Sequence, residues 1–216
     1  MAITFLILTG VAAAGDWAAV WQRLFRLEYL LKPLTLALLI AAAAAADLGA
    51  AKPWVLAALA FGLLGNVALM LSQDVPGRPD PAFLVGLASF LIGNAAYLVA
   101  FLRHGVHGLH LLAGLLIVAG AAVLTLPLVL RGSRRAGGMP LMAAVAAYAV
   151  LLGATAVLAV GTSAIATALG GLLLLASDAA LGWDRFVKRL RRGPLLVIVS
   201  YHLAQLLIVI GLIRHR

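Results

Sequence analysis

The chain has 216 residues, of which 65% are hydrophobic and only 11% are charged, and its formal net charge is +9. Charged residues make up about a quarter of an ordinary soluble domain, so this composition excludes one and indicates an integral membrane protein. Cysteine is absent, which excludes disulfides, thiolate nucleophiles and thiolate metal sites. The basic residues lie in short gaps between apolar runs without interleaved aromatics, so we expect no nucleic-acid partner.

Eight apolar segments follow one another along the chain, each close to the roughly 20 residues that a membrane crossing needs. They are residues 1–21, 33–50, 53–72, 82–102, 108–130, 140–160, 162–181 and 194–213. The clearest gaps are DVPGRPDP (residues 74–81), whose prolines and glycine exclude a helix, and RGSRRAGG (residues 131–138). No gap is long enough for a soluble domain. The sequence therefore predicts one all-α domain, residues 1–216, built as a membrane bundle of about eight transmembrane helices.

The first segment ends in VAAAGD (residues 11–16), which resembles a signal-peptidase site. It lacks the positively charged region that opens a secretory signal, so we expect it to be retained as a helix. Asp16 would then lie near the end of that helix, close to the lipid headgroups.

Lysine and arginine are divided unevenly between the two sides of an eight-span chain. One side holds only Lys52, Arg103, Arg214 and Arg216. The first, third, fifth and seventh gaps, on the other side, hold twelve of the sixteen basic residues: Arg23, Arg26, Lys32, Arg78, Arg131, Arg134, Arg135, Arg185, Lys188, Arg189, Arg191 and Arg192. The positive-inside rule places these twelve in the cytoplasm. We therefore expect a multi-pass protein of the cell membrane with both termini on the non-cytoplasmic side.

Polar side chains inside the spans gather at related depths. At 1.5 Å per residue, Asp178 lies about 5 Å, Asn66 about 9 Å, Tyr201 about 10 Å, and Gln205 and Asn94 about 17–18 Å from the cytoplasmic ends of their spans. A polar group in hydrocarbon costs several kcal/mol unless it is paired, so such residues usually face the bundle interior. They predict a buried polar pocket reached from the cytoplasmic leaflet. Further polar residues in or at the ends of the spans include Lys32, Tyr97, Tyr148, Ser177, Ser200 and His202.

A second interpretation of these residues stays open. Polar side chains inside spans often hydrogen-bond a neighbouring helix, for roughly 0.6–2 kcal/mol each. The repeated Gly-Asn pairs then allow close helix approach at Gly65 and Gly93, and Asn66 and Asn94 hold the contact together. Asp178 favours a functional role more strongly, because an intramembrane carboxylate is a functional hypothesis by default; its alternative is an ion pair near the helix end.

Three histidines, His104, His107 and His110, recur at three-residue intervals, a spacing that metal ligands can share. No carboxylate lies near them in the sequence, so we predict no metal site there. No cofactor is indicated either.

Five motifs occur in order along the chain: KPLTLALLIA (32–41), GLLGNVALML (62–71), FLIGNAAYLVAF (90–101), LLLLASDAALGWDRF (172–186) and SYHLAQLLIVIGL (200–212). Each motif alone matches by chance too easily, but their order, spacing and polar positions together resemble the YhhN-like lysoplasmalogenase family, from the second predicted span to the eighth. The resemblance implies an eight-span membrane protein. Characterised members of that family hydrolyse the vinyl ether bond of lysoplasmalogens to a fatty aldehyde and a glycerophospho-choline or -ethanolamine.

The resemblance also implies roles for individual residues. Vinyl ether cleavage needs a general acid, a group that stabilises the developing cation, and a positioned water. On this hypothesis Asp178 is the anionic group and Tyr201 or His202 the proton donor. The residues expected to contact the lysolipid are Lys32, Asn66, Asn94, Tyr97, Ser177 and Gln205.

The chain departs from the family pattern at two positions. Where it has Asn66 the family typically has Asp, and where it has Asn94 the family typically has His. Asparagine keeps the shape and hydrogen bonding of these residues but exchanges no proton. Two hypotheses follow: a lysoplasmalogenase-like hydrolase, or a catalytically silent relative that binds a lysophospholipid or a related amphiphile. A third hypothesis, a transporter or membrane assembly factor, has less support, because the sequence has no charged relay and no obvious broken-helix pair. Membrane lipids are the expected surroundings, and the many small residues would let almost any helix face form a homo-oligomer.

Overall fold

The computed structural model describes residues 1–72 and 80–213, and these residues are almost entirely helical. The elements are α1 (Ala2–Gln22), α2 (Phe25–Ala45), the 3-10 helix η1 (Gly49–Ala51), α3 (Lys52–Leu71), α4 (Pro81–His104), α5 (Gly108–Gly161), α6 (Ile165–Phe186) and α7 (Gly193–Leu212). Within this described part there is no β-strand, and seven helices are long and apolar enough to cross a membrane. The prediction of an all-α membrane bundle is confirmed.

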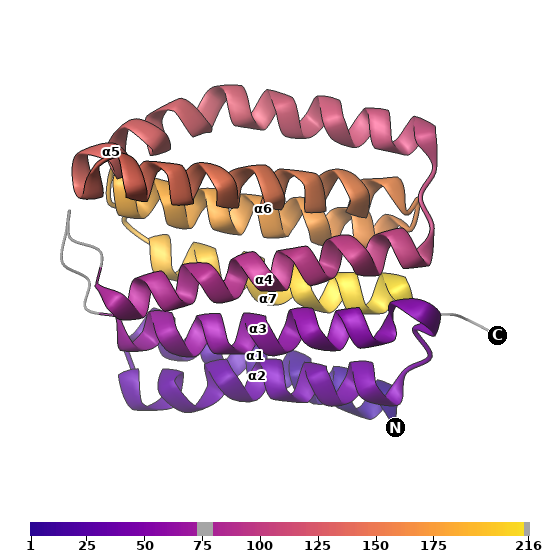
Figure 1. The fold of residues 1–216 in the computed structure, drawn as a ribbon. Helices are drawn as coiled ribbons and strands as arrows, with labels where there is room; N and C mark the ends of the chain where they lie inside the picture. The colour runs from indigo at the N-terminus through magenta and orange to yellow at the C-terminus, as the bar shows by residue number, and fades with distance from the viewer. Residues whose placement is uncertain (73–79, 214–216) are drawn as a thin grey trace.

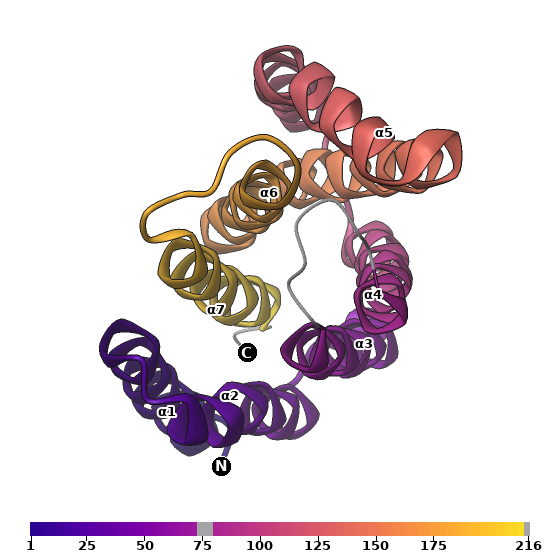
Figure 2. The same cartoon turned by 90° about the vertical axis from the view of Figure 1, so that its left-hand side faces the viewer.

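Consecutive helices lie antiparallel and pack against one another (Figure 1). The helix α7 packs on α6 and also contacts α1 and α2, so the series closes on itself, as the view along the helices in Figure 2 shows. The helices α1, α3 and α6 therefore end, and α2, α4 and α7 begin, at one end of the bundle, on the left in Figure 1. We call it the arginine-rich end, because Arg23, Arg131, Arg185 and Arg192 belong to the turns and helix ends there.

The helix α5 is two antiparallel legs rather than one rod. Its 54 residues would span about 81 Å if straight, far more than the roughly 30 Å hydrocarbon core. Gly137 and Gly138 have non-helical backbone angles, and Gly138 has φ +69°, a conformation that glycine adopts without steric cost. The chain reverses there (Figure 1). A Cβ on Gly114 of the first leg would lie 3.0 Å from the carbonyl oxygen of Val157 on the second, so the legs touch closely.

Helix boundaries differ from the predicted spans in three places. The gap expected at residues 131–138 shrinks to the two glycines at the reversal. The helix α2 begins at Phe25 rather than near residue 33, because Arg23 turns the chain in the left-handed conformation and Pro33 is accommodated inside the helix. The helix α6 continues to Phe186, beyond the predicted end at residue 181. Most of the predicted turn DVPGRPDP lies outside the described residues.

The helices α3 and α4 approach closely at the two Gly-Asn pairs. A Cβ on Gly93 would lie 3.2 Å from the carbonyl oxygen of Ala58, and one on Gly65 would lie 2.8 Å from the ring of Phe90. The glycines therefore do set the distance between these helices. The asparagines do not hold the contact together: the Asn94 amide bonds elsewhere, and the amide nitrogen of Asn66 has no hydrogen-bond partner among the described residues.

Candidate functional site

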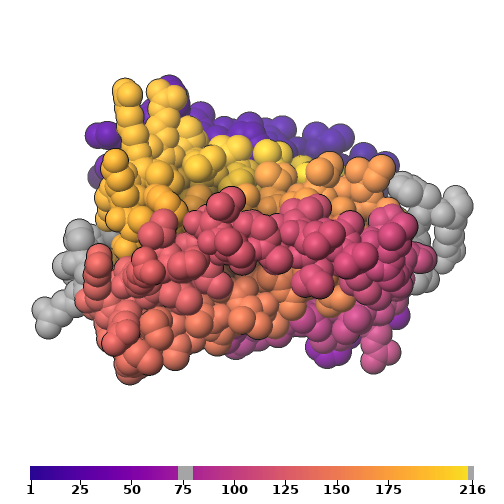
Figure 3. All heavy atoms as spheres, turned by 90° about the horizontal axis from the view of Figure 1, so that it is seen from above, coloured from indigo at the N-terminus to yellow at the C-terminus, as the bar shows by residue number. Residues whose placement is uncertain are grey.

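A cavity of about 470 Å³ lies between the two legs of α5, the helix α6 and the beginning of α4. Leucine, valine, isoleucine, alanine and phenylalanine side chains form most of its wall. Seen from the side that α5 covers, the first leg of α5 runs along the surface over the length of the bundle (Figure 3). The reversal at Gly137 thus encloses a space that a single straight helix could not enclose.

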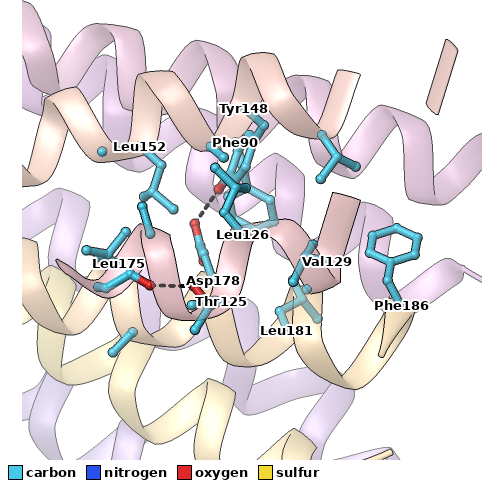
Figure 4. A pocket seen from close by; sticks show the side chains of 18 of the residues that line it. Phe90, Thr125, Leu126, Val129, Tyr148, Leu152, Leu175, Asp178, Leu181 and Phe186 are labelled. Atoms are coloured by element: carbon cyan, nitrogen blue, oxygen red, sulfur yellow. Dashed lines mark hydrogen bonds between the residues drawn. The ribbon is translucent and has the colours of Figure 1, made fainter. Parts of the chain in front are cut away.

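Asp178 on α6 and Tyr148 on the second leg of α5 form a polar pair in the cavity wall (Figure 4). The Tyr148 hydroxyl donates a hydrogen bond to Oδ2 of Asp178. The other carboxyl oxygen, Oδ1, accepts no hydrogen bond among the described residues. Counted along α6, Asp178 lies eight residues, about 12 Å, before the last helical residue Phe186. A carboxyl group with one free oxygen therefore faces an apolar cavity well below the headgroup level.

Asn94 of α4 hydrogen-bonds to Tyr148 and so orients the Asp178–Tyr148 pair. Its amide nitrogen donates to the Phe90 carbonyl at 3.0 Å and to the Tyr148 hydroxyl at 3.4 Å. A carbonyl can only accept, so the bond to Phe90 fixes which end of the amide is nitrogen. The Tyr148 hydroxyl must then accept from Asn94, and its own proton points to Asp178. The Thr155 hydroxyl has two acceptors within reach, the backbone carbonyl of Leu151 in its own helix at 2.8 Å and the backbone carbonyl of Asn94 at 3.2 Å.

Arg185 lines the end of the cavity that is nearest the arginine-rich end of the bundle, and we call this end of the cavity its mouth. It is half-buried, it lines the cavity, and its guanidinium carbon lies 4.7 Å from the centre of the Phe83 ring. Phe83 in turn packs edge-to-face on Phe186, with ring centres 6.1 Å apart. The mouth therefore carries a cation beside aromatic rings, and the interior beyond it is mostly apolar.

A second polar group lies behind the cavity wall, among α3, α4 and α7. Tyr97, which is almost fully buried, donates a hydrogen bond to Oε1 of Gln205. The Tyr201 hydroxyl lies within electrostatic range of the Asn66 and Gln205 side chains but makes no hydrogen bond of good geometry among the described residues. The Tyr201 ring packs edge-to-face on Phe90 at 5.9 Å, and Phe90 lines the cavity. One aromatic ring thus separates this group from the cavity.

The remaining predicted site residues lie on other faces of α2, α6 and α7. Lys32 pairs with Glu28 one turn earlier on α2, at 2.5 Å. His202 is buried within electrostatic range of Lys32, and neither ring nitrogen has a hydrogen-bond partner among the described residues. The Ser177 hydroxyl donates to the Val197 carbonyl at 3.0 Å and joins α6 to α7. The nine predicted residues therefore do not form one cluster, and of the nine only Asp178 lines the cavity itself.

Sequence reasoning missed three features of this region. Tyr148 was recognised as an intramembrane polar residue, but its pairing with Asp178 joins positions 30 apart. Arg185 counts among the predicted topology determinants, and its place in the cavity wall is a feature that the sequence does not indicate. Asp16 was expected near the headgroups. It is fully buried on α1, and neither carboxyl oxygen has a hydrogen-bond partner among the described residues.

The fold and the cavity define a class: a helical membrane bundle with an internal apolar cavity that carries a carboxyl–tyrosine pair. A family model agrees with that description and matches residues 27–212. The chain belongs to the YhhN family, as the five motifs predicted. The matched segment begins in α2, so α1 and its Asp16 lie outside it. Comparisons with curated proteins and with solved structures gave no match.

Proposed function

We propose that this protein hydrolyses the vinyl ether bond of lysoplasmalogens, with Asp178 as the proton-exchanging group. One observation carries the proposal: the Asp178–Tyr148 pair interrupts the apolar wall of the cavity partway along its length. The volume falls within the range of small-molecule sites, which combine mostly apolar walls with a few placed polar groups. A lysolipid has the matching order of an apolar chain, a reactive ether and a polar head. Membership in a family that includes lysoplasmalogenases supports the same conclusion.

The reaction begins with a proton transfer from Asp178 to carbon. Tyr148 donates to Oδ2, so a proton on Asp178 resides on Oδ1, the oxygen left for the cavity. Transfer of this proton to the outer vinyl carbon forms a C–H bond from the double-bond electrons and leaves a cation shared by the inner carbon and the ether oxygen. The new carboxylate lies beside that cation and stabilises it, as carboxylates do for oxocarbenium ions in glycosidases.

Water completes the reaction. It adds to the cationic carbon and returns a proton to Asp178, which gives a hemiacetal. The hemiacetal then breaks its bond to the glycerol oxygen, which takes up a proton as the hemiacetal hydroxyl loses its own. The products are a fatty aldehyde and the glycerophospho-alcohol, and Asp178 is again protonated. The apolar wall keeps other nucleophiles away from the cation.

The test uses purified protein in detergent with lysoplasmenyl-ethanolamine as substrate and long-chain aldehyde as readout. The wild-type protein is expected to release aldehyde, and Asp178→Asn to release none, because an amide keeps the shape of the acid and cannot give up a proton to carbon. Thr125→Val is the matched control. Thr125 lines the same cavity, but its hydroxyl donates only to the Ala121 carbonyl of its own helix, at 2.9 Å. Wild-type activity that survives in Asp178→Asn would overturn the assignment.

A second candidate function is binding of a lysophospholipid without turnover. The observation that favours it is the position of Asn94, one hydrogen bond from Tyr148, where the family pattern has a proton-exchanging histidine. Asn66 likewise replaces an acid. If the wild-type protein binds the lysolipid and releases no aldehyde, Asn66→Asp combined with Asn94→His is expected to create activity. A silent double variant would leave binding as the function.

The membrane arrangement is part of the proposal. We propose eight crossings, because each leg of α5 is long enough to cross and the chain reverses at Gly137–Gly138. The excess of lysine and arginine then puts the arginine-rich end in the cytoplasm and both termini outside, in the cell membrane. The cavity mouth at Arg185 faces the cytoplasmic leaflet in this arrangement.

A further inference from the structure

We propose that Arg185 forms a phosphate-binding subsite at the cavity mouth, which selects lysolipids with a phosphate headgroup and sets their direction in the cavity. The phosphate lies at the arginine-rich end and the chain points toward the opposite face of the membrane. The effect of Arg185 on which substrate is hydrolysed rests on the proposed function. The binding of a phosphate by Arg185 rests on the cavity alone.

The spacing on α6 places Arg185 correctly for this role. It follows Asp178 by seven residues, two helical turns, so both side chains lie on the face of α6 that lines the cavity. The rise between them is about 10 Å. Long side chains on a helix lean toward its N-terminus, which brings the guanidinium closer to Asp178. In a lysoplasmalogen only the three glycerol carbons separate the ether oxygen from the phosphate ester. A vinyl ether at Asp178 therefore puts its phosphate within reach of Arg185.

The surroundings of Arg185 suit an anion. Its guanidinium stacks on the Phe83 ring at 4.7 Å, which fixes the plane from which paired N–H groups can meet two phosphate oxygens. The neighbouring acid, Asp184, is already engaged: it accepts from Arg189 at 3.0 Å and from the Leu190 backbone N–H at 2.6 Å.

The rest of the cavity fixes the direction of the chain. Away from the mouth and past Asp178, α6 contributes Leu172 and Leu175, and the α5 legs contribute Ile117, Leu152 and Gly153. None of these side chains offers a hydrogen bond. An acyl-type chain is therefore favoured beyond Asp178, and a phosphate is favoured only at the mouth, because burying an unpaired charge in the apolar part would cost several kcal/mol.

The experiment compares two substrates that differ only in the phosphate headgroup: lysoplasmenyl-ethanolamine and the corresponding 1-alkenylglycerol. The wild-type protein is expected to show a kcat/KM about 10- to 100-fold higher for the phospholipid. This ratio corresponds to the free energy of one charge-assisted hydrogen-bonded contact. Arg185→Gln is expected to remove this preference and to leave the rate with 1-alkenylglycerol unchanged. Arg185→Lys, which keeps the charge but not the paired donors, is expected to recover part of it. The control is Arg189→Gln, since Arg189 is exposed and pairs with Asp184.

The outcomes separate the two proposals. An equal loss for both substrates in Arg185→Gln would mean that Arg185 only supports the fold, and no loss for either would mean that it does not meet the phosphate; each overturns the subsite. If no aldehyde forms from either substrate, the hydrolase proposal fails and the subsite is tested by binding. The probes are then 1-O-alkyl-lysophosphatidylethanolamine and 1-O-alkylglycerol. The wild-type protein is expected to bind the first about 10- to 100-fold more tightly, and Arg185→Gln is expected to lose this preference. Equal affinities in the wild-type protein would overturn the subsite.

Discussion

The bond between Tyr148 and Asp178 yields a quantitative prediction. Tyr148→Phe removes one hydroxyl and keeps the ring in the cavity wall, and Asp178→Leu removes both carboxyl oxygens at about the same size. Hydrogen bonds inside membrane bundles average about 0.6 kcal/mol, and bonds to an ionised group are roughly twice as strong as neutral ones. The bond from Tyr148 to the protonated Asp178 from which the reaction starts should therefore contribute about 0.6 kcal/mol. The two substitutions together should cost less than the sum of their separate effects by that amount.

The assay is reversible unfolding in mixed micelles for the wild-type protein, both single variants and the double variant. Independent sites add within about 0.3–0.5 kcal/mol, so a coupling near 0.6 kcal/mol lies just above that scatter. A coupling near 1.2 kcal/mol would indicate an ionised acid and would contradict the protonated starting state. Additive effects would refute the pairing, and with it the orientation that gives Oδ1 the proton. Thr125→Val, combined with Asp178→Leu, is the control pair, because the Thr125 hydroxyl donates to the Ala121 carbonyl of its own helix.

Three further predictions concern packing, a buried acid and topology. Gly170→Ala is expected to destabilise the bundle by about 1–3 kcal/mol through overpacking, since a Cβ there would lie 2.8 Å from the Ala204 carbonyl oxygen on α7; Gly120→Ala, with nothing within 4 Å, is expected to be neutral or stabilising in the same thermal unfolding series. Asp16→Leu is expected to raise the unfolding temperature, because the buried carboxyl without hydrogen bonds costs about 1–3 kcal/mol; a lowered temperature would mean that Asp16 has a partner that stabilises it. A reporter active only in the cytoplasm is expected to work when inserted at the Gly137–Gly138 reversal and to be silent after residue 216, and the opposite pattern would reverse the proposed sidedness.

The fold was largely predictable because hydrocarbon leaves few choices. A run of about 20 apolar residues can satisfy its backbone in lipid only as a helix or within a closed barrel. The helix boundaries were harder to predict, because proline and charged residues near a boundary are also compatible with a continuing helix. Pro33 suggested a helix start, yet it sits inside α2. The three arginines of the gap at residues 131–138 suggested a loop, yet the first leg of α5 carries them to Gly137. Charged side chains near the headgroups do not break a helix, so charge marks the membrane boundary and not the helix end.

The partners of the site residues were not predictable from the sequence. Counting residues along each span gives their depths, and in the structure Asn66 and Asp178 lie nearer the arginine-rich ends of their helices while Asn94 and Gln205 lie just past the middle of theirs. Rotation about each helix axis decides which of them meet, and a 20-residue apolar helix shows little amphipathic pattern by which to read that rotation. Tyr201 and His202 illustrate the difficulty. They are adjacent on α7, yet Tyr201 packs on Phe90 toward the cavity while His202 lies within electrostatic range of Lys32 on α2.

Asn94 bears most directly on whether the cavity catalyses. An asparagine cannot shuttle a proton, so it cannot replace a histidine that acts as an acid or base. It can replace a neutral histidine that only donates a hydrogen bond, and donation is what its amide does here, toward Tyr148. The order Asn94 to Tyr148 to Asp178 then leaves a single group, Asp178, to give and regain the proton. Vinyl ether cleavage needs only one such group, because the proton delivered to carbon is replaced from the added water. On this argument the substitution at position 94 removes a proton site and keeps the reaction possible.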